Sequence, residues 1–418
     1  MKNRLRLEVD ATSHLKLPLV EFHDYFLSTQ LELPLIMEDL DGNLVPTLLT
    51  YGKRIDRYRW CYSTGPDWPN NIDIDTGLCC IAKHIAKICN ATRSNWVSLL
   101  LDEIAIVNQQ LVLKTRLPIA DLDTFMCWQG FAIDSLCKQH IGPYQLERLD
   151  KHTALLKPVN VDACAFELIH TKNRAEGRCL YDKGHLDIGW GIGVPTEFFR
   201  KDDSGPFSPN HNQSPFVYTL QAGVNVPPNE YKHIFNIIKN ADTSLPGVSS
   251  VHSRVIQENF TNQNSRISDL ADIGNVKRPL YYTNYSPNNE MADTIIDACD
   301  LKLSKKLISY LDLVQGQVDT SDGYTLCLEY PMFPGIWGRI PNSIRYLSKQ
   351  MAPSRTHALA TSLIAQPKAD LAHVVELETQ IDEEERKIVL GRLELRFRSK
   401  YMMPISPSGR FPLSNITE

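Results

Sequence analysis

Residues 166–191 read FELIHTKNRAEGRCLYDKGHLDIGWG, and they give the strongest indication of the fold. The run AFELIH, at 165–170, is apolar and rich in β-forming residues, so it predicts a strand. Gly177 and Gly184 are the first of several glycines that separate short segments after it. This pattern predicts a β-rich core over residues 156–275.

The regions on either side of this core have a different character. Residues 47–60 carry apolar side chains at helical spacing, and residues 125–141 also predict a helix. Residues 1–155 therefore predict a mixed α/β N-terminal region. Residues 276–418 predict a mostly helical C-terminal region. In its last expected helix, 369–401, acidic residues precede basic ones, which is typical of a solvated helix with ion pairs along its face.

Composition and charge limit the function classes. The 418 residues include 44 Lys and Arg against 49 Asp and Glu, and the net charge of −5 argues against a surface coated in basic residues for duplex DNA. We find no secretory leader and no apolar run long enough to cross a membrane. The ten cysteines are single apart from Cys79 and Cys80, and they form no CxxC pair. We therefore expect a reduced, cytoplasmic protein with no membrane partner.

The β-rich core contains a candidate metal site. His185 and Asp187 are two residues apart, so on a strand both side chains point to the same face. A second imidazole would complete two histidines and one carboxylate on one side of Fe(II), and His252 is the candidate. Further along the chain, Arg266 and Ser268 supply a guanidinium and a hydroxyl, a pair suited to holding a carboxylate.

The order His-x-Asp, His, Arg-x-Ser resembles that of the iron- and 2-oxoglutarate-dependent oxygenases related to isopenicillin N synthase. The stretches SSVHSRVI and LKLPLVEFHDYF add to the resemblance. It implies a jelly-roll-like central domain in which His185, Asp187 and His252 hold Fe(II). It also implies that Arg266 and Ser268 bind 2-oxoglutarate. The chain would then be a dioxygenase that hydroxylates an unidentified small molecule or peptide, with the oxidising chemistry supplied by the cofactors.

Residues 354–380 support a second interpretation. They read SRTHALATSLIAQPKADLAHVVELETQ and resemble the Arg-His-x-x-Ala-Thr helix of tyrosine recombinases. That resemblance implies a DNA-binding, DNA-recombining protein in which Arg355 and His357 stabilise charge at the scissile phosphate. Tyr401 would be its nucleophile. The acidic net charge argues against this function, because phosphate contacts dominate the affinity of such proteins for DNA.

Two alternatives stay open beside these. The aromatic and proline-rich stretch YPMFPGIWGRIP, residues 330–341, is either a binding loop or a rigid packed connection. The third function that we keep is a non-catalytic subunit of a larger assembly.

Overall fold

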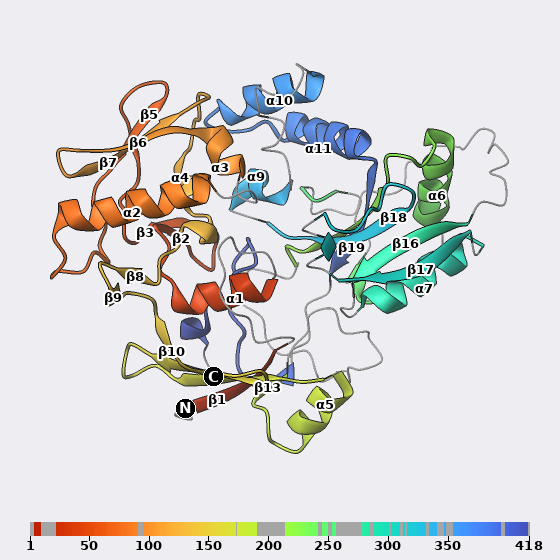
Figure 1. The fold of residues 1–418 in the computed structure, drawn as a ribbon, viewed down its shortest axis with the longest axis horizontal. Coiled ribbons are helices and arrows are strands. Elements are labelled where there is room, and N and C mark those ends of the chain that lie inside the picture. Colours follow the sequence, from red (N-terminus) through yellow and green to blue (C-terminus); the bar gives the residue numbers. More distant parts are fainter. Residues whose placement is uncertain are drawn as a thin grey trace.

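The computed structural model has a mixed α/β architecture, in which several sheets are flanked by helices (Figure 1). It describes residues 4–9, 22–90, 95–172, 174–189, 214–240, 245–249, 253–255, 277–283, 287–300, 302–309, 312–313, 316–331, 334–340, 347, 354–393 and 398–416.

The first sheet combines strands from both ends of the chain. Its strands, in order, are β10 (Tyr144–Leu149), β11 (Thr153–Pro158), β12 (Ala165–His170), β1 (Arg4–Val9), β13 (Ile188–Gly189) and β20 (Arg398–Ser399). β1 pairs in parallel with both β12 and β13. β12 is the strand predicted from AFELIH, and it buries Phe166 and Leu168 on one face. The helices α1 (Phe22–Leu31) and α5 (Arg174–Asp182) contact this sheet.

The second sheet belongs to the N-terminal part of the chain. Its strands, in order, are β4 (Lys53–Arg54), β5 (Arg59–Tyr62), β7 (Gln110–Thr115) and β6 (Leu101–Val107). α2 (Ile74–Cys89) begins at Asp73, whose carboxylate accepts a hydrogen bond from the Thr76 backbone N–H at 2.9 Å. The helix buries Leu78, Ile81 and Ile85 in the core that this sheet also lines. α3 (Asn95–Leu100) leads directly into β6.

Short elements connect these two sheets. They are β2 (Ile36–Glu38), β3 (Leu44–Pro46), α4 (Asp123–Met126), the 3-10 turn η2 (Gln129–Phe131), β8 (Ser135–Leu136) and β9 (Gln139–His140).

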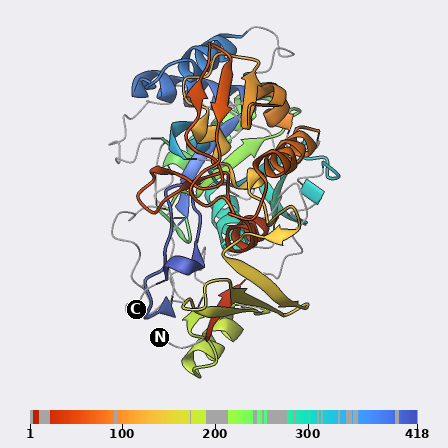
Figure 2. The ribbon, with the colours of Figure 1, turned by 90° about the vertical axis from the view of Figure 1, so that its left-hand side faces the viewer.

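The third sheet lies in the C-terminal half. Its strands, in order, are β15 (Val248–Ser249), β19 (Lys387–Leu393), β14 (Val217–Ala222), β18 (Tyr324–Glu329), β16 (Arg278–Thr283) and β17 (Leu303–Ile308). α6 (Pro228–Asn240) and α7 (Asn288–Ala298) flank it in Figure 1. Figure 2 shows α10 (Arg355–Ile364) and α11 (Leu371–Glu385) at the end of the molecule opposite the first sheet. α9 (Gly335–Arg339) and the 3-10 turn η5 (Leu413–Asn415) are short.

Two helices expected from apolar spacing do not form. Within 47–60, Leu48 is buried whereas Tyr51 and Ile55 are each 50% exposed, so these residues do not share one apolar face. The segment instead contains β4 and most of the turn into β5. Residues 125–141 form the end of α4, then η2, and then the β8–β9 hairpin.

Two hydrophobic clusters hold the described residues together. One joins the first and third sheets with α1 and the C-terminal segment, and the other joins the second sheet with α2, α10 and α11. Burial on this scale is the main source of stability for a chain of this size.

The expected mixed α/β class is confirmed, but the jelly-roll-like core is wrong. A jelly roll is built from antiparallel strands, whereas β1–β12 and β16–β17 are parallel pairs. The division at residues 155 and 275 stays a prediction. Among the described helices, none has the length and apolar composition that a membrane crossing requires.

Candidate functional site

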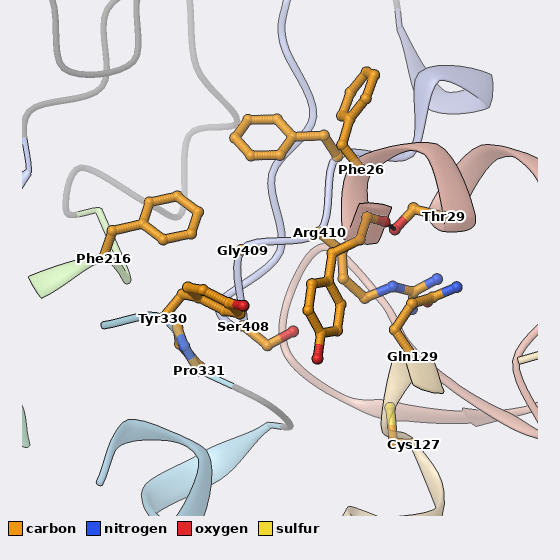
Figure 3. A pocket seen from close by; sticks show the side chains of 12 residues that line it. Phe26, Thr29, Cys127, Gln129, Phe216, Tyr330, Pro331, Ser408, Gly409 and Arg410 are labelled. Carbon is orange, nitrogen blue, oxygen red and sulfur yellow. Dashed lines mark hydrogen bonds between the residues drawn. The ribbon is translucent and has the colours of Figure 1, made fainter. Parts of the chain in front are cut away.

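A cleft between α1 and the ends of strands β14 and β18 of the third sheet is the candidate site (Figure 3). The space in which the centre of a water molecule fits is about 30 Å³, and it opens to solvent. Segments from five parts of the chain line it, and their residues are Tyr25, Phe26, Thr29, Cys127, Gln129, Phe216, Tyr330, Pro331, Ser408, Gly409, Arg410 and Phe411. The cleft therefore exists only in the folded chain.

Aromatic rings form much of the wall. Tyr25 on α1 meets Tyr330, just after β18, in an edge-to-face contact with 5.4 Å between ring centroids. Phe26 and Phe411 pack with 6.5 Å between centroids. Phe216 completes the set from the start of β14. Such a wall suits an apolar or aromatic part of a ligand.

Arg410 and Gln129 lie on the side of the cleft away from Phe216 and Tyr330 (Figure 3). Arg410 is the charged residue among the twelve that line the space. Its Nη1 donates to the Glu38 carbonyl at 3.2 Å, but its buried Nε has no hydrogen-bond partner among the described residues. Gln129 is 4% exposed, and its Oε1 likewise has no hydrogen-bond partner in the part of the chain that the structure describes. A buried donor and a buried acceptor are thus both unsatisfied at one site, which is costly unless a ligand or water pairs with them.

A tight turn holds Arg410 in place. Gly409 has φ +86°, a backbone conformation that favours glycine, and its N–H donates to the Ser406 carbonyl at 2.9 Å. The Glu38 carboxylate from β2 accepts from Ser406 Oγ at 2.6 Å and from the Ser408 N–H at 3.2 Å. Burial lowers the pKa of Arg410, yet an arginine keeps its charge in proteins. Glu38 therefore anchors a turn that presents a fixed positive charge.

Gln129 is oriented from the opposite side by α1. Its Nε2 donates to Ser28 Oγ at 2.9 Å, and Ser28 Oγ donates in turn to the Glu32 carboxyl. Burial raises the pKa of Glu32 to about 8. Because the amide nitrogen donates to Ser28, the buried oxygen of Gln129 is the amide atom for which the described residues provide no partner.

Cys127 lines the same cleft as a neutral thiol. Burial raises its pKa to about 12, so it carries no negative charge to pair with Arg410 at neutral pH. The cleft thus combines one positive charge, one unpaired amide oxygen and an aromatic wall.

The residues expected to hold iron do not form a described metal site. The Asp187 carboxylate accepts from the Arg6 backbone N–H at 3.0 Å and from Arg6 Nε at 3.1 Å, whereas His185 is exposed. His252, Arg266 and Ser268 lie outside the described residues. Across the part of the chain that the structure describes, we find no group of three or more His, Cys, Asp or Glu side chains that could hold a metal ion.

The residues of the recombinase interpretation are also separated. Arg355 is 81% exposed and pairs with Glu376 of α11, and His357 lies in the first turn of α10. Tyr401 is fully buried in the cluster of the first and third sheets, whereas α10 packs in the other cluster. A buried hydroxyl on a different core cannot act as nucleophile beside Arg355.

Sequence reasoning missed most of the cleft. Tyr330 and Pro331 fall in the 330–341 segment, which we considered as a binding loop, whereas Tyr25, Phe26, Cys127 and Gln129 fall in stretches to which we gave other roles. Arg410 and Gln129 belong to no recognisable motif, and their significance lies in their unpaired buried atoms.

Comparison with known structures identifies the fold. The murein tripeptide binding protein MppA of Escherichia coli superposes with a TM-score of 0.74 and 12% identity, covering 99% of this chain and 98% of that one. The periplasmic oligopeptide-binding protein OppAIV of Borrelia burgdorferi superposes with a TM-score of 0.75 and 13% sequence identity, covering 100% of both chains. NikA of Staphylococcus aureus, in complex with Ni(L-His)2, gives 0.70 and 11%, covering 99% of both chains. No family model matches the sequence, and no curated protein matches it.

These matches correct several expectations. The chain has the two-lobed fold of solute-binding proteins, so the resemblances to 2-oxoglutarate oxygenases and to tyrosine recombinases are wrong. The activities that these resemblances implied are therefore also wrong, namely hydroxylation with Fe(II) and 2-oxoglutarate, DNA binding and DNA recombination. The third function that we kept, a non-catalytic subunit of a larger assembly, gains no support. The expected cytoplasmic location is overturned as well, because MppA and OppAIV are periplasmic proteins.

Proposed function

We propose that this chain is a solute-binding protein that captures a small organic molecule in the cleft. The observation that carries the proposal is the pair of unsatisfied buried atoms, Arg410 Nε and Gln129 Oε1, in a cleft walled by aromatic rings. A fold shared along its whole length with solute-binding proteins supports the same function.

The cleft indicates which ligand chemistry to expect. A carboxylate suits Arg410, because a guanidinium makes directional, charge-assisted hydrogen bonds to planar anions. An N–H or O–H donor suits Gln129 Oε1, and an apolar side chain suits the wall of Tyr25 and Tyr330. A short peptide or an acylated amino acid carries all three groups. We therefore infer a ligand that is an organic acid with an amide or hydroxyl donor and an apolar part.

The structural neighbours do not by themselves indicate which ligand this chain binds. Their names and titles cite a murein tripeptide, oligopeptides, agropinic acid and a nickel complex of histidine. The same fold thus serves different ligands, and the class proposed for this chain depends on its own side chains.

Closure of the two lobes is the expected binding movement. MppA in its unliganded open form superposes on this chain with a TM-score of 0.62, against 0.74 for the other MppA structure. In this chain the Tyr25–Tyr330 contact already bridges α1 and the third sheet. A ligand that contacts both sides would stabilise this closed arrangement.

Thermal denaturation with a ligand panel tests the proposal. The panel contains di- and tripeptides and N-acyl amino acids, each as the free acid and as its C-terminal amide. We expect at least one free acid to raise the melting temperature and its amide to raise it less. At 100 times the dissociation constant, such a ligand adds about 2.7 kcal/mol to the stability.

Variants identify the site. Arg410→Ala should abolish the response, whereas Arg57→Ala, which removes an exposed arginine of the β4–β5 turn, should leave it intact. A panel in which no compound shifts the wild-type chain, or in which the shifts survive Arg410→Ala, would reject the proposal.

The neighbours also suggest a location and a partner. We infer that the chain acts outside the cytoplasm and delivers its ligand to a membrane transporter, because the names of OppAIV and of DppA from Helicobacter pylori describe periplasmic binding proteins of ABC transporters. Fractionation of cells that produce the tagged natural protein would test this location.

A further inference from the structure

Two cysteine thiols lie in contact away from the cleft. Cys80 Sγ on α2 and Cys137 Sγ in the β8–β9 turn are 3.5 Å apart, and both side chains are partly exposed. They are 57 positions apart in the chain, so the contact is created by the fold. From this geometry we propose that Cys80 and Cys137 form a reversible disulfide.

Both partners are held firmly in place. Ile81, next to Cys80, and Leu136, next to Cys137, are fully buried in the same core. Cys137 and Lys138 form a two-residue turn with φ of 53° and 72°, a conformation that other residues adopt less easily than glycine or asparagine. The hairpin thus keeps the thiol over α2 at some conformational cost. The two sulfur atoms must approach from 3.5 Å to a bond length of about 2.05 Å.

Formation of the bond requires an oxidant, and glutathione disulfide or a protein disulfide of the same reactivity supplies it. One thiolate attacks the oxidant and releases one glutathione thiol, which leaves a mixed disulfide on the protein. The second cysteine then attacks the protein sulfur of that mixed disulfide and releases the second glutathione thiol. The protein loses two hydrogens, and one disulfide of the oxidant is reduced to two thiols.

The neighbouring charges influence the rate of this reaction. Burial and the adjacent Cys80 thiol raise the pKa of Cys137, and Asp73 adds to this effect. Exchange should therefore accelerate as the pH rises, because the thiolate is the attacking species.

The disulfide would restrain a segment that matters for the cleft. Residues 80–137 include Cys127 and Gln129, and α2 contacts η2, the turn to which Gln129 belongs. A covalent tie between α2 and the β8–β9 hairpin would restrict this loop in the unfolded chain and so stabilise the fold. The inference depends on the two sulfur atoms alone and does not require the proposed ligand.

Peptide mapping of the full chain tests the inference. The protein is equilibrated with an excess of glutathione disulfide over glutathione, alkylated, digested without reduction and analysed by mass spectrometry. We expect a pair of peptides joined through Cys80 and Cys137, with a mass about 2 Da below the sum of the two free peptides. The oxidised chain should also have a higher melting temperature than the reduced chain.

Cys79→Ser is the matched control. Cys79 is the adjacent, exposed cysteine on the same helix, so its loss should leave the linked peptides unchanged. Cys80→Ser and Cys137→Ser should each abolish both the linked peptides and the gain in melting temperature. A wild-type map that shows only glutathione adducts at these positions, or a crosslink that disappears in Cys79→Ser, would overturn the inference.

Discussion

Arg254 Nε lies 2.5 Å from Glu329 Oε2 in the interior beside the third sheet, and both side chains are more than 90% buried. The same guanidinium reaches Asp382 Oδ2 at 2.8 Å, and the Arg254 backbone N–H donates to Glu378 Oε1 at 2.6 Å. Lys387 pairs with Glu329 at 3.1 Å on the other side. One arginine thus joins β18 to α11 through three carboxylates.

Replacement of Arg254 by Met should destabilise the fold strongly. The change leaves Glu329, Glu378 and Asp382 buried with less positive charge, and breaking a buried pair in this way typically costs about 3–5 kcal/mol. Urea denaturation measures the loss. Arg355→Met is the control, because Arg355 also pairs with a carboxylate of α11 but is 81% exposed, so its loss should cost about 1 kcal/mol or less. Equal losses of stability in the two variants would show that burial does not determine how much each arginine contributes to the fold.

Glu32 should make the stability depend on pH. Burial raises its pKa from 4.5 to about 8 in the folded chain. Below pH 4.5 the carboxyl is protonated in both states. Between pH 4.5 and 8 the unfolded chain loses the proton while the folded chain keeps it, so stability falls as the pH rises and the loss is complete above pH 8. The full effect is up to about 5 kcal/mol.

Glu32→Gln should remove this dependence. The amide is neutral at every pH and can still accept from Ser28, so the variant should gain stability over the wild type as the pH rises from 5 to 8. Urea denaturation at several pH values measures the difference. Glu147→Gln, at an exposed site on β10, should show no such trend. A constant difference between Glu32→Gln and the wild type across this pH range would show that Glu32 is ionised in the folded chain.

The sequence predicts local structure better than it predicts the site. The strand at 165–170 is found because a short β-prone run bounded by turn-forming residues has few alternatives. The expected helix at 369–401 is found only up to Glu385, because Arg386 adopts a left-handed conformation with φ 55° and β19 follows. Its acidic residues were interpreted as a solvated face, yet Asp382 is bound to the buried Arg254. The spacing of residues along a helix does not reveal an ion-pair partner that is distant in the sequence.

The cleft could not be predicted for the same reason. Tyr25, Gln129, Tyr330 and Arg410 are far apart in the sequence, and the return of the C-terminal segment past α1 brings Arg410 to the others. Gln30 of α1 is hydrogen-bonded to this C-terminal segment. Its Nε2 donates to the Phe411 carbonyl at 2.6 Å, and its Oε1 accepts from the Leu413 N–H at 2.9 Å. His-x-Asp and similar short patterns occur by chance, whereas a site assembled from isolated residues has no local pattern.

Gly177→Ala should destabilise the protein although it lies in a helix. In a helix interior, replacement of glycine by alanine usually increases the free energy of unfolding by about 0.5–1 kcal/mol. Here the new methyl group would lie 1.8 Å from Glu8 Oε1, and this carboxylate is fully buried with Arg398 and Thr171 as partners. We expect a net loss of about 1–3 kcal/mol. A double-mutant cycle with Glu8→Ala checks the cause, because the loss should shrink or reverse once the carboxylate is absent.

The aromatic wall should contribute to ligand affinity through Tyr330. Its ring meets Tyr25 of α1 edge to face, so removal of the ring takes away both the proposed ligand contact and the contact between α1 and the end of β18. Tyr330→Ala should weaken binding of the peptide or N-acyl amino acid found in the panel by about 10-fold, which corresponds to 1.4 kcal/mol. Tyr330→Phe keeps the ring and should bind nearly as well as the wild type, because our proposal assigns the polar recognition to Arg410 and Gln129. Tyr58→Ala, at an exposed turn, controls for the loss of a tyrosine as such. Isothermal titration calorimetry measures all three variants. Should Tyr330→Phe bind as poorly as Tyr330→Ala, the hydroxyl and not the ring would be the recognition group, and the expected apolar part of the ligand would have to be replaced by a polar one.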